Sequence, residues 1–195
     1  MNQKNKPIAA PSLRQLGRLR RQTGELSMIE AAAVMAGAAL LALAAYAGGK
    51  FVYDRVQAYR FKEEAQFFHS GVLDATVNDT DFSGETLQNL ALNKAFDSAG
   101  SRVASDHSTV QGLFGGSVTA NIGSVDATND AIIVNYPVPA SVCTLSMAAI
   151  VNAYTMVAVN GTTIFGPSTA FDSATVGNAC QGNGPVTVSM YTTKN

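Results

Sequence analysis

The hydropathy pattern of this chain is dominated by an uncharged apolar run between Glu30 and Lys50. Its 19 residues are almost all Ala, Leu, Val, Met or Gly. A helix of about 20 residues is needed to cross the hydrocarbon core of a bilayer. Ala has the highest helix propensity, and no proline occurs between Pro11 and Pro137. The pattern therefore predicts a helix that can span a membrane.

After Lys50 the pattern becomes amphipathic, with charged residues on the other faces. The apolar residues expected near one face are Phe51, Val52, Val56, Tyr59 and Ala65. The apolar and amphipathic stretches join without a helix-breaking residue. We predict one continuous helix over 26–70, with Gly71 as its C-cap.

The remaining sequence indicates short, mixed elements. Asn160-Gly161 between two β-rich runs is a strong hairpin signal, and Pro137 and Pro139 are expected to end the strand before them. The sequence around them predicts an α+β head with a small antiparallel sheet. The predicted helices are 84–96, with Ser83 as N-cap, and 140–152; the predicted strands are 118–122, 131–136, 154–159, 162–165 and 186–192.

Charge divides the chain into three predicted parts. Residues 1–24 form a leader with six basic residues and no acid, whereas from residue 74 onward nine acids face three bases. Basic residues before a spanning helix hold the N-terminus in the cytoplasm and send the following domain across. The helix occupies 25–71, with a membrane half (25–49) and an amphipathic half (50–71), and the head 72–195. The head is acidic and therefore lacks the basic surface that a nucleic-acid-binding domain needs.

Two cysteines, Cys143 and Cys180, lie in the head. If the head is exported, an even pair in a small domain indicates one disulfide; free buried thiols are the alternative. A metal site is disfavoured, because His69 and His107 lack ligand spacing to either cysteine.

The chain offers no recognisable catalytic constellation. Neither histidine has a nucleophile or an orienting acid at a familiar spacing. The glycine-rich stretch 112–116 lacks the lysine of a phosphate loop. The acidic stretch 78–81 is better explained as a solvated loop than as a cation site. We therefore expect no enzyme activity, no cofactor and no metal.

A resemblance to a known family begins at Gly24. This glycine, the following Leu-Ser-Met-Ile-Glu (26–30) and the alanine-rich helix resemble the processing site of a type IV prepilin. The long leader and the run LSMIEAAAV are especially similar to type IVb, bundle-forming pilins. The Cys143 and Cys180 pair matches the family's C-terminal disulfide loop. The resemblance implies the pilin fold, in which a long N-terminal helix packs on a small antiparallel sheet and the head carries one disulfide.

The family also implies cleavage of the leader by a prepilin peptidase after a glycine, and N-methylation of the new terminus. The family's glutamate is fifth in the mature chain. Cleavage between Gly24 and Glu25 makes Glu30 sixth; cleavage between Glu25 and Leu26 makes it fifth but places Glu before the bond. We favour Gly24/Glu25, with Glu25 methylated, because a side chain directly before the bond should hinder the peptidase. Leu26 is the methylated residue in the alternative.

Glu30 is the candidate assembly residue. Leader removal exposes an α-amino group that is positive near neutral pH. The resemblance implies that this amine, on an adjacent subunit, pairs with Glu30 in a dry filament core and sets the subunit register. Small residues from Ala31 to Ala39 would allow close helix packing. The alternative is that Glu30 merely lies at the membrane interface of a plain signal anchor.

The resemblance implies a structural function. The chain would be the major subunit of a type IVb pilus, held in the inner membrane of a Gram-negative-type bacterium and then polymerised into an extracellular helical filament. An ATPase and an inner-membrane platform would drive assembly, and adhesion, aggregation or conjugative mating would be the use. A minor pilin or a type II secretion pseudopilin is one alternative. A periplasmic binding or enzymatic domain on an uncleaved anchor is the alternative from another class.

Overall fold

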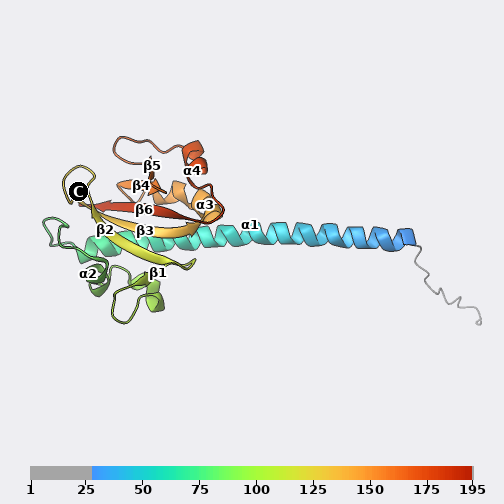
Figure 1. The fold of residues 1–195 in the computed structure, drawn as a ribbon, viewed down its shortest axis with the longest axis horizontal. Helices are drawn as coiled ribbons and strands as arrows, with labels where there is room; N and C mark the ends of the chain where they lie inside the picture. The colour runs from blue at the N-terminus through green and yellow to red at the C-terminus, as the bar shows by residue number, and fades with distance from the viewer. Residues whose placement is uncertain (1–27, 195) are drawn as a thin grey trace, which may run out of the picture. The chain divides into compact units, whose positions relative to one another are not determined.

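The structure, a computed structural model, describes residues 28–194, with side chains from residue 32 onward. Helix α1 (Met28–Ala75) opens the described chain, and the boundary between two compact units falls inside it, between Tyr46 and Ala47. The helices and strands of the described chain are labelled in Figure 1.

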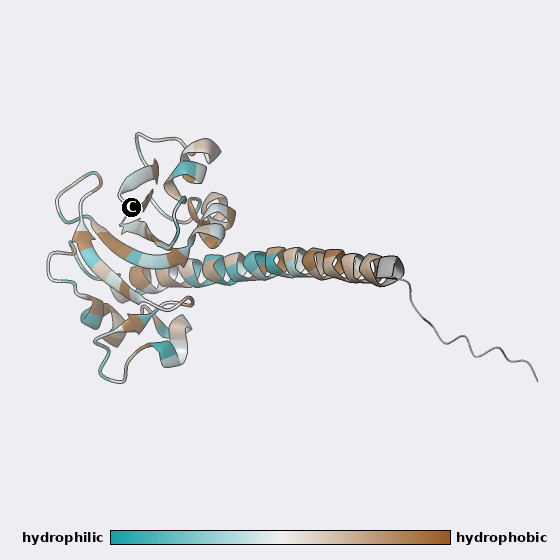
Figure 2. Cartoon of the chain, turned by 45° about the vertical axis from the view of Figure 1, so that its right-hand side comes forward, coloured by the Kyte–Doolittle hydropathy of each residue, from teal (hydrophilic) through white to brown (hydrophobic). Residues whose placement is uncertain are grey.

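In the first unit, α1 carries the apolar run found in the sequence. The side chains of 32–46 are exposed on every side of the helix. Figure 2 shows the hydrophobic colour gathered in this part of α1, with polar residues following it. Within the described chain, α1 is one helix whose length and apolar composition suffice to cross a membrane. This agrees with the predicted span.

The second unit contains the C-terminal part of α1, which continues beyond its predicted end. Gly71 is not a C-cap: it lies inside the helix, which ends at Ala75. A Cβ atom at this position would overlap the main-chain oxygen of Ala95. The glycine is therefore required for close approach of another segment, and not for the left-handed turn that a C-cap needs.

A six-stranded antiparallel sheet forms the centre of this unit, in the order β1-β2-β3-β6-β4-β5. β3 and β6 are the longest strands and lie side by side in its middle (Figure 1). The strands are β1 (Val110–Gln111), β2 (Ser117–Gly123), β3 (Ala131–Pro139), β4 (Met156–Val159), β5 (Thr162–Phe165) and β6 (Pro185–Thr193). The Asn160-Gly161 hairpin is present, with φ of 49° and 82° at these residues, as the sequence signal predicted.

β3 runs through the two prolines that were expected to stop it. Pro137 pairs with Thr187 and Pro139 with Pro185, both on β6. Pairing with β2 ends at Asn135, so β3 has a single neighbour from there on. A proline is tolerated where one side of a strand is unpaired, because its missing N–H is not needed there.

The short helices differ most from expectation. α2 (Leu87–Leu92) is shorter than predicted, and its N-cap is Thr86, whose side chain accepts a hydrogen bond from the Asn89 N–H. Ser83 instead donates its N–H and hydroxyl to Asp81. A 3₁₀ segment, η1 (Asp97–Arg102), follows. The side chains of Thr86 and Asp81 accept hydrogen bonds from nearby main-chain N–H groups. Such local hydrogen bonds favour a short, capped helix over the longer helix that was predicted.

Two further helices carry the cysteines. α3 (Ala140–Ile150) was predicted over 140–152 and contains Cys143, whereas α4 (Ser173–Ala179) was not predicted. Asp172 caps α4 by accepting from the Thr175 N–H at 2.8 Å. Asp is a favoured N-cap residue, so Asp172 is the signal that could have located this helix. Cys180 follows α4 directly.

The hydrophobic core lies between α1 and the sheet. A buried stripe recurs along α1 at alternating steps of three and four residues, the spacing of one helix face. It consists of Ala58, Phe61, Ala65, Phe68 and Val72. Phe61 and Phe68 contact Tyr136 on β3, with ring centroids 4.8 and 6.1 Å apart. The helix is thereby packed on one face of the antiparallel sheet, which confirms the predicted fold class.

Cys143 and Cys180 form a disulfide that joins α3 to the end of α4 across 37 residues. In the chain-entropy model, closing a loop of this length stabilises the folded chain by roughly 3–4 kcal/mol. We therefore expect Cys143→Ser and Cys180→Ser each to lower the unfolding free energy by about that amount, and to lower filament yield.

The double variant is the matched control, because either single substitution already removes the whole crosslink. Its unfolding free energy, measured with denaturant, should equal that of the single variants. Unchanged melting and yield in the single variants would show that the crosslink contributes nothing.

Candidate assembly surface

The exposed apolar part of α1 is the first candidate surface. Leu41 is 74% exposed and Met35 70%, and no charged side chain occurs among residues 32–46. Soluble monomers rarely expose a contiguous apolar surface of this kind, so such a surface marks contact with lipid or with another protein. The large exposed side chains are Val34, Met35, Leu40, Leu41, Leu43 and Tyr46.

The second unit presents a different face on its part of α1. Val52, Val56 and Tyr59 are exposed on the side opposite the buried stripe. A cation lies beside them: the Lys62 ammonium is 6.0 Å from the centroid of Tyr59. Such pairs keep charge next to apolar rings without burying it. This face is suited to contacts that mix apolar packing with charge.

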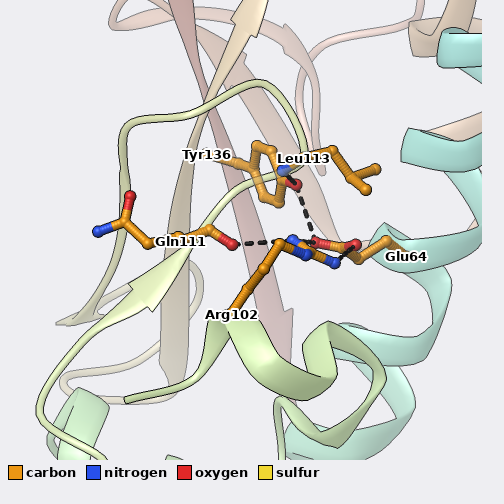
Figure 3. Close-up of polar contacts among 5 residues, drawn as sticks. All are labelled: Glu64, Arg102, Gln111, Leu113 and Tyr136. Atoms are coloured by element: carbon orange, nitrogen blue, oxygen red, sulfur yellow. Dashed lines mark hydrogen bonds and ion pairs between the residues drawn. The ribbon is translucent and has the colours of Figure 1, made fainter.

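A buried polar network fixes α1 to the head (Figure 3). Arg102 pairs with both carboxylate oxygens of Glu64: Nη1 donates to Oε1 at 2.9 Å, and Nη2 donates to Oε2. The Tyr136 hydroxyl donates to Oε1 at 2.8 Å and accepts the Leu113 N–H at 2.6 Å. Arg102 Nη1 also donates to the Gln111 carbonyl at 2.8 Å. The network thus joins α1, η1, the end of β1 with the loop that follows it, and β3.

The electrostatics of this network are self-consistent. Glu64 is only 6% exposed, and a buried carboxylate is strongly destabilising unless it is paired and hydrogen-bonded. Hydrogen bonding to Glu64 raises the pKa of Arg102 above its usual value. Burial raises the pKa of Tyr136 well above its usual range, so its hydroxyl stays protonated and donates. Arg102 and Tyr136 therefore keep the same protonation state throughout the physiological range.

Glycine makes this arrangement possible at Gly112. A Cβ atom there would lie 2.9 Å from the Tyr136 ring. Without a side chain, the loop can approach closely enough for the next residue, Leu113, to donate its N–H to the Tyr136 hydroxyl. The glycine-rich stretch 112–116, which lacked the features of a phosphate loop, thus has a packing role.

His69 occupies a second polar contact between α1 and the sheet. Its Nδ1 lies 3.0 Å from the Thr192 hydroxyl on β6, and its ring is 4.9 Å from that of Tyr154. Asp74 and Lys194 line the same cleft. The imidazole is half-buried, and burial lowers the pKa of His69 below its ordinary value of 6.5.

This burial gives the head a pH-dependent stability. We expect the unfolding free energy to fall as the pH drops below about 6.5, because the unfolded chain then binds a proton at His69 that the folded chain resists. His69→Gln should remove this part of the pH dependence. His107→Asn is the control, because Asn tolerates the positive φ of 58° at this turn. Denaturant midpoints between neutral and mildly acidic pH measure how the unfolding free energy changes with pH. The same pH dependence in His69→Gln as in the natural chain would contradict a role for His69.

The predicted processing site lies outside the part of the chain that the structure describes. Gly24, Glu25 and Leu26 lie outside the described residues, and the side chain of Glu30 does too. Their roles remain predictions.

Sequence reasoning missed Glu64, Arg102 and Tyr136. One signal could have found Glu64: it lies three residues after Phe61 and four before Phe68, on the buried stripe of α1. A lone carboxylate on a core-facing stripe requires a partner. Nothing in the sequence names Arg102 as that partner.

Comparison with known proteins decides the family. The PilS family model (PilS N terminal) matches residues 63–193. The chain is a type IV pilin of the PilS family. No curated protein matches it. Among solved structures, the type IV pilin TcpA from Vibrio cholerae El Tor biotype is similar, with a TM-score of 0.46 and 15% identity, over 68% of this chain and 98% of that one.

The family match falls on a part of the chain different from the one that first indicated a pilin. The prepilin resemblance rested mainly on residues 24–50, whereas the matched segment comprises the C-terminal part of α1 and nearly all of the head. The two stretches support the same family independently. This pilin is therefore a pilus subunit, and family membership implies assembly with copies of itself.

Proposed function

We propose that this pilin is the major structural subunit of a type IVb pilus, and that it performs no chemistry itself. The observation that carries the proposal is the apolar surface of residues 32–46, exposed on every side of α1. In the membrane this surface is covered by lipid. In a filament, the same surface is covered by equivalent helices of neighbouring subunits.

The proposal includes maturation at the cytoplasmic end of the helix. Prepilin peptidase removes residues 1–24, and the new N-terminus at Glu25 is methylated; the register one residue later, at Leu26, is the alternative. Glu30 then pairs with the α-amino group of an adjacent subunit. Alanine and glycine dominate the helix after Glu30, and small residues permit the close helix packing that such a pair requires.

The proposed route leads from the inner membrane to the cell exterior. An inner-membrane platform and its ATPase extract the processed subunit from lipid and add it to the base of the filament. The basic leader supports the required orientation, with the head on the outer side of the inner membrane. Adhesion, aggregation and conjugative mating are the uses compatible with such a filament.

The abundance of the chain in surface filaments tests the major-subunit role. Filaments sheared from producing cells should consist chiefly of this chain, and cells lacking it should yield none. A minor pilin or a pseudopilin would instead be a trace component of filaments built from another subunit. Recovery of the chain solely as a membrane-held monomer would support the uncleaved anchor and overturn the proposal.

A further inference from the structure

Two Asn-Gly sequences occur in the head, and their asparagine side chains lie in different surroundings. Asn160-Gly161 forms the tight turn between β4 and β5, and Asn183-Gly184 lies in the exposed loop before β6. An asparagine followed by glycine is prone to deamidation, because glycine has no side chain to hinder attack by its main-chain nitrogen. Sequence alone therefore makes both positions candidates.

Asn160 is held at both ends of its side-chain amide. Its Oδ1 accepts the Thr187 N–H at 3.0 Å, and its Nδ2 donates to the Ala179 carbonyl at 3.3 Å. The Asn160 main-chain N–H also donates to the Thr187 carbonyl at 2.9 Å. Rotation of this side chain toward Gly161 breaks both side-chain hydrogen bonds, which slows the reaction.

Asn183 has neither restraint. The loop 181–184 is exposed throughout, and among the described residues no hydrogen bond holds the Asn183 side chain. A Cβ atom built on Gly184 or on Gly161 meets nothing within 4 Å, so the two sites differ in how the asparagine side chain is held and not in the space beside the glycine. We propose that Asn183 is the site of spontaneous deamidation in this head and that Asn160 is spared.

The reaction uses the chain's own atoms and one water molecule. The Gly184 nitrogen attacks the Asn183 side-chain carbonyl carbon, its proton passes to solvent base, and ammonia leaves as the succinimide ring closes. Water then opens the ring to aspartate or isoaspartate. A neutral amide thereby becomes a carboxylate in a loop that lines the same cleft as Lys50.

The loop can accept the longer isoaspartate backbone. It is anchored at one end by the Cys143–Cys180 disulfide and at the other by Pro185, which pairs with Pro139. Because the loop between these anchors is exposed, the change should leave the thermal midpoint of the head unchanged.

The experiment follows both sites in one sample. The full chain, purified in detergent, is incubated in mildly alkaline buffer and digested, and peptide mass spectrometry quantifies aspartate and isoaspartate at each position. Asn183 should react at least about tenfold faster than Asn160, because the Asn160 side chain must first lose two hydrogen bonds. Equal rates, or faster reaction at Asn160, would overturn the proposal.

An unfolded control separates structure from sequence. In concentrated urea with reductant, the two Asn-Gly sites should react at similar rates, because neither side chain is then held. If the large difference persisted after unfolding, local sequence would be its cause, and the structural argument would be wrong. The Asn183→Gln variant should remove the acidic isoforms of the folded chain; persistence of these isoforms would also contradict the proposal.

Discussion

Replacing Glu64 by Ala is expected to lower the unfolding free energy of the head by about 3 kcal/mol, the lower end of the range for breaking a buried ion pair. The substitution leaves the Tyr136 hydroxyl and the Arg102 guanidinium without their carboxylate. Because the Arg102 side chain is 27% exposed, water can solvate part of its guanidinium in the variant. We therefore expect no larger loss of unfolding free energy. Denaturant unfolding of the full chain in detergent measures the change.

The neighbouring residue provides the matched control. Glu63 is exposed on the same helix turn, so Glu63→Ala removes an equal charge and has the same effect on helix propensity. We expect that variant to stay within about 0.5 kcal/mol of the natural chain, as is usual at the surface. If both variants lost the same stability, the network would not be what holds α1 to the head.

Glu30→Gln is expected to abolish filament assembly while leaving leader removal and membrane insertion intact. The substitution keeps the size of the side chain and removes its charge, so the subunit's terminal amine enters the filament core without a partner. An unpaired buried charge costs several kcal/mol, and a loss of 1.4 kcal/mol per subunit contact already reduces assembly about tenfold. Sheared filament yield measures the effect.

A conservative substitution makes this test specific. Glu30→Asp retains the charge on a shorter side chain and should restore part of the yield. Normal filament yield from Glu30→Gln would refute the pairing. Failure of leader removal in Glu30→Gln would show that Glu30 acts in recognition by the peptidase and not in assembly.

Features governed by local sequence were predictable. The apolar run before Lys50 and the Asn160-Gly161 hairpin each follow from hydropathy or turn chemistry within a few residues. The helix face that packs on the sheet was predicted wrongly except at Ala65. Phe51, Val52, Val56 and Tyr59 were expected on the same face as Ala65 but are exposed, because the head packs against a different stripe of the helix.

Features governed by distant contacts were not predictable. Glycine is a typical helix C-cap residue, but Gly71 lies inside the helix and allows the main chain at Ala95 to approach closely. Proline is typical of a strand end. β3 nevertheless continues through Pro137, because β2 no longer pairs with it there and the missing N–H of proline is not needed. Each depends on a segment far along the chain, which local propensity does not encode.

The buried network shows the same limit at the candidate site. Glu64 could have been suspected from its position on the core-facing stripe. Its partners come from residues 38 and 72 positions further along the chain. Their selection depends on how η1 and β3 fold against α1.

The central claim is that this pilin is trimmed at the start of its apolar helix and then polymerises through it. The most direct test is the intact mass of the subunit from sheared surface filaments. The account predicts the loss of residues 1–24, or of 1–25 in the alternative register, together with one added methyl group. Subunits that retain Met1 and the full leader, within filaments or alone in the membrane, would contradict it.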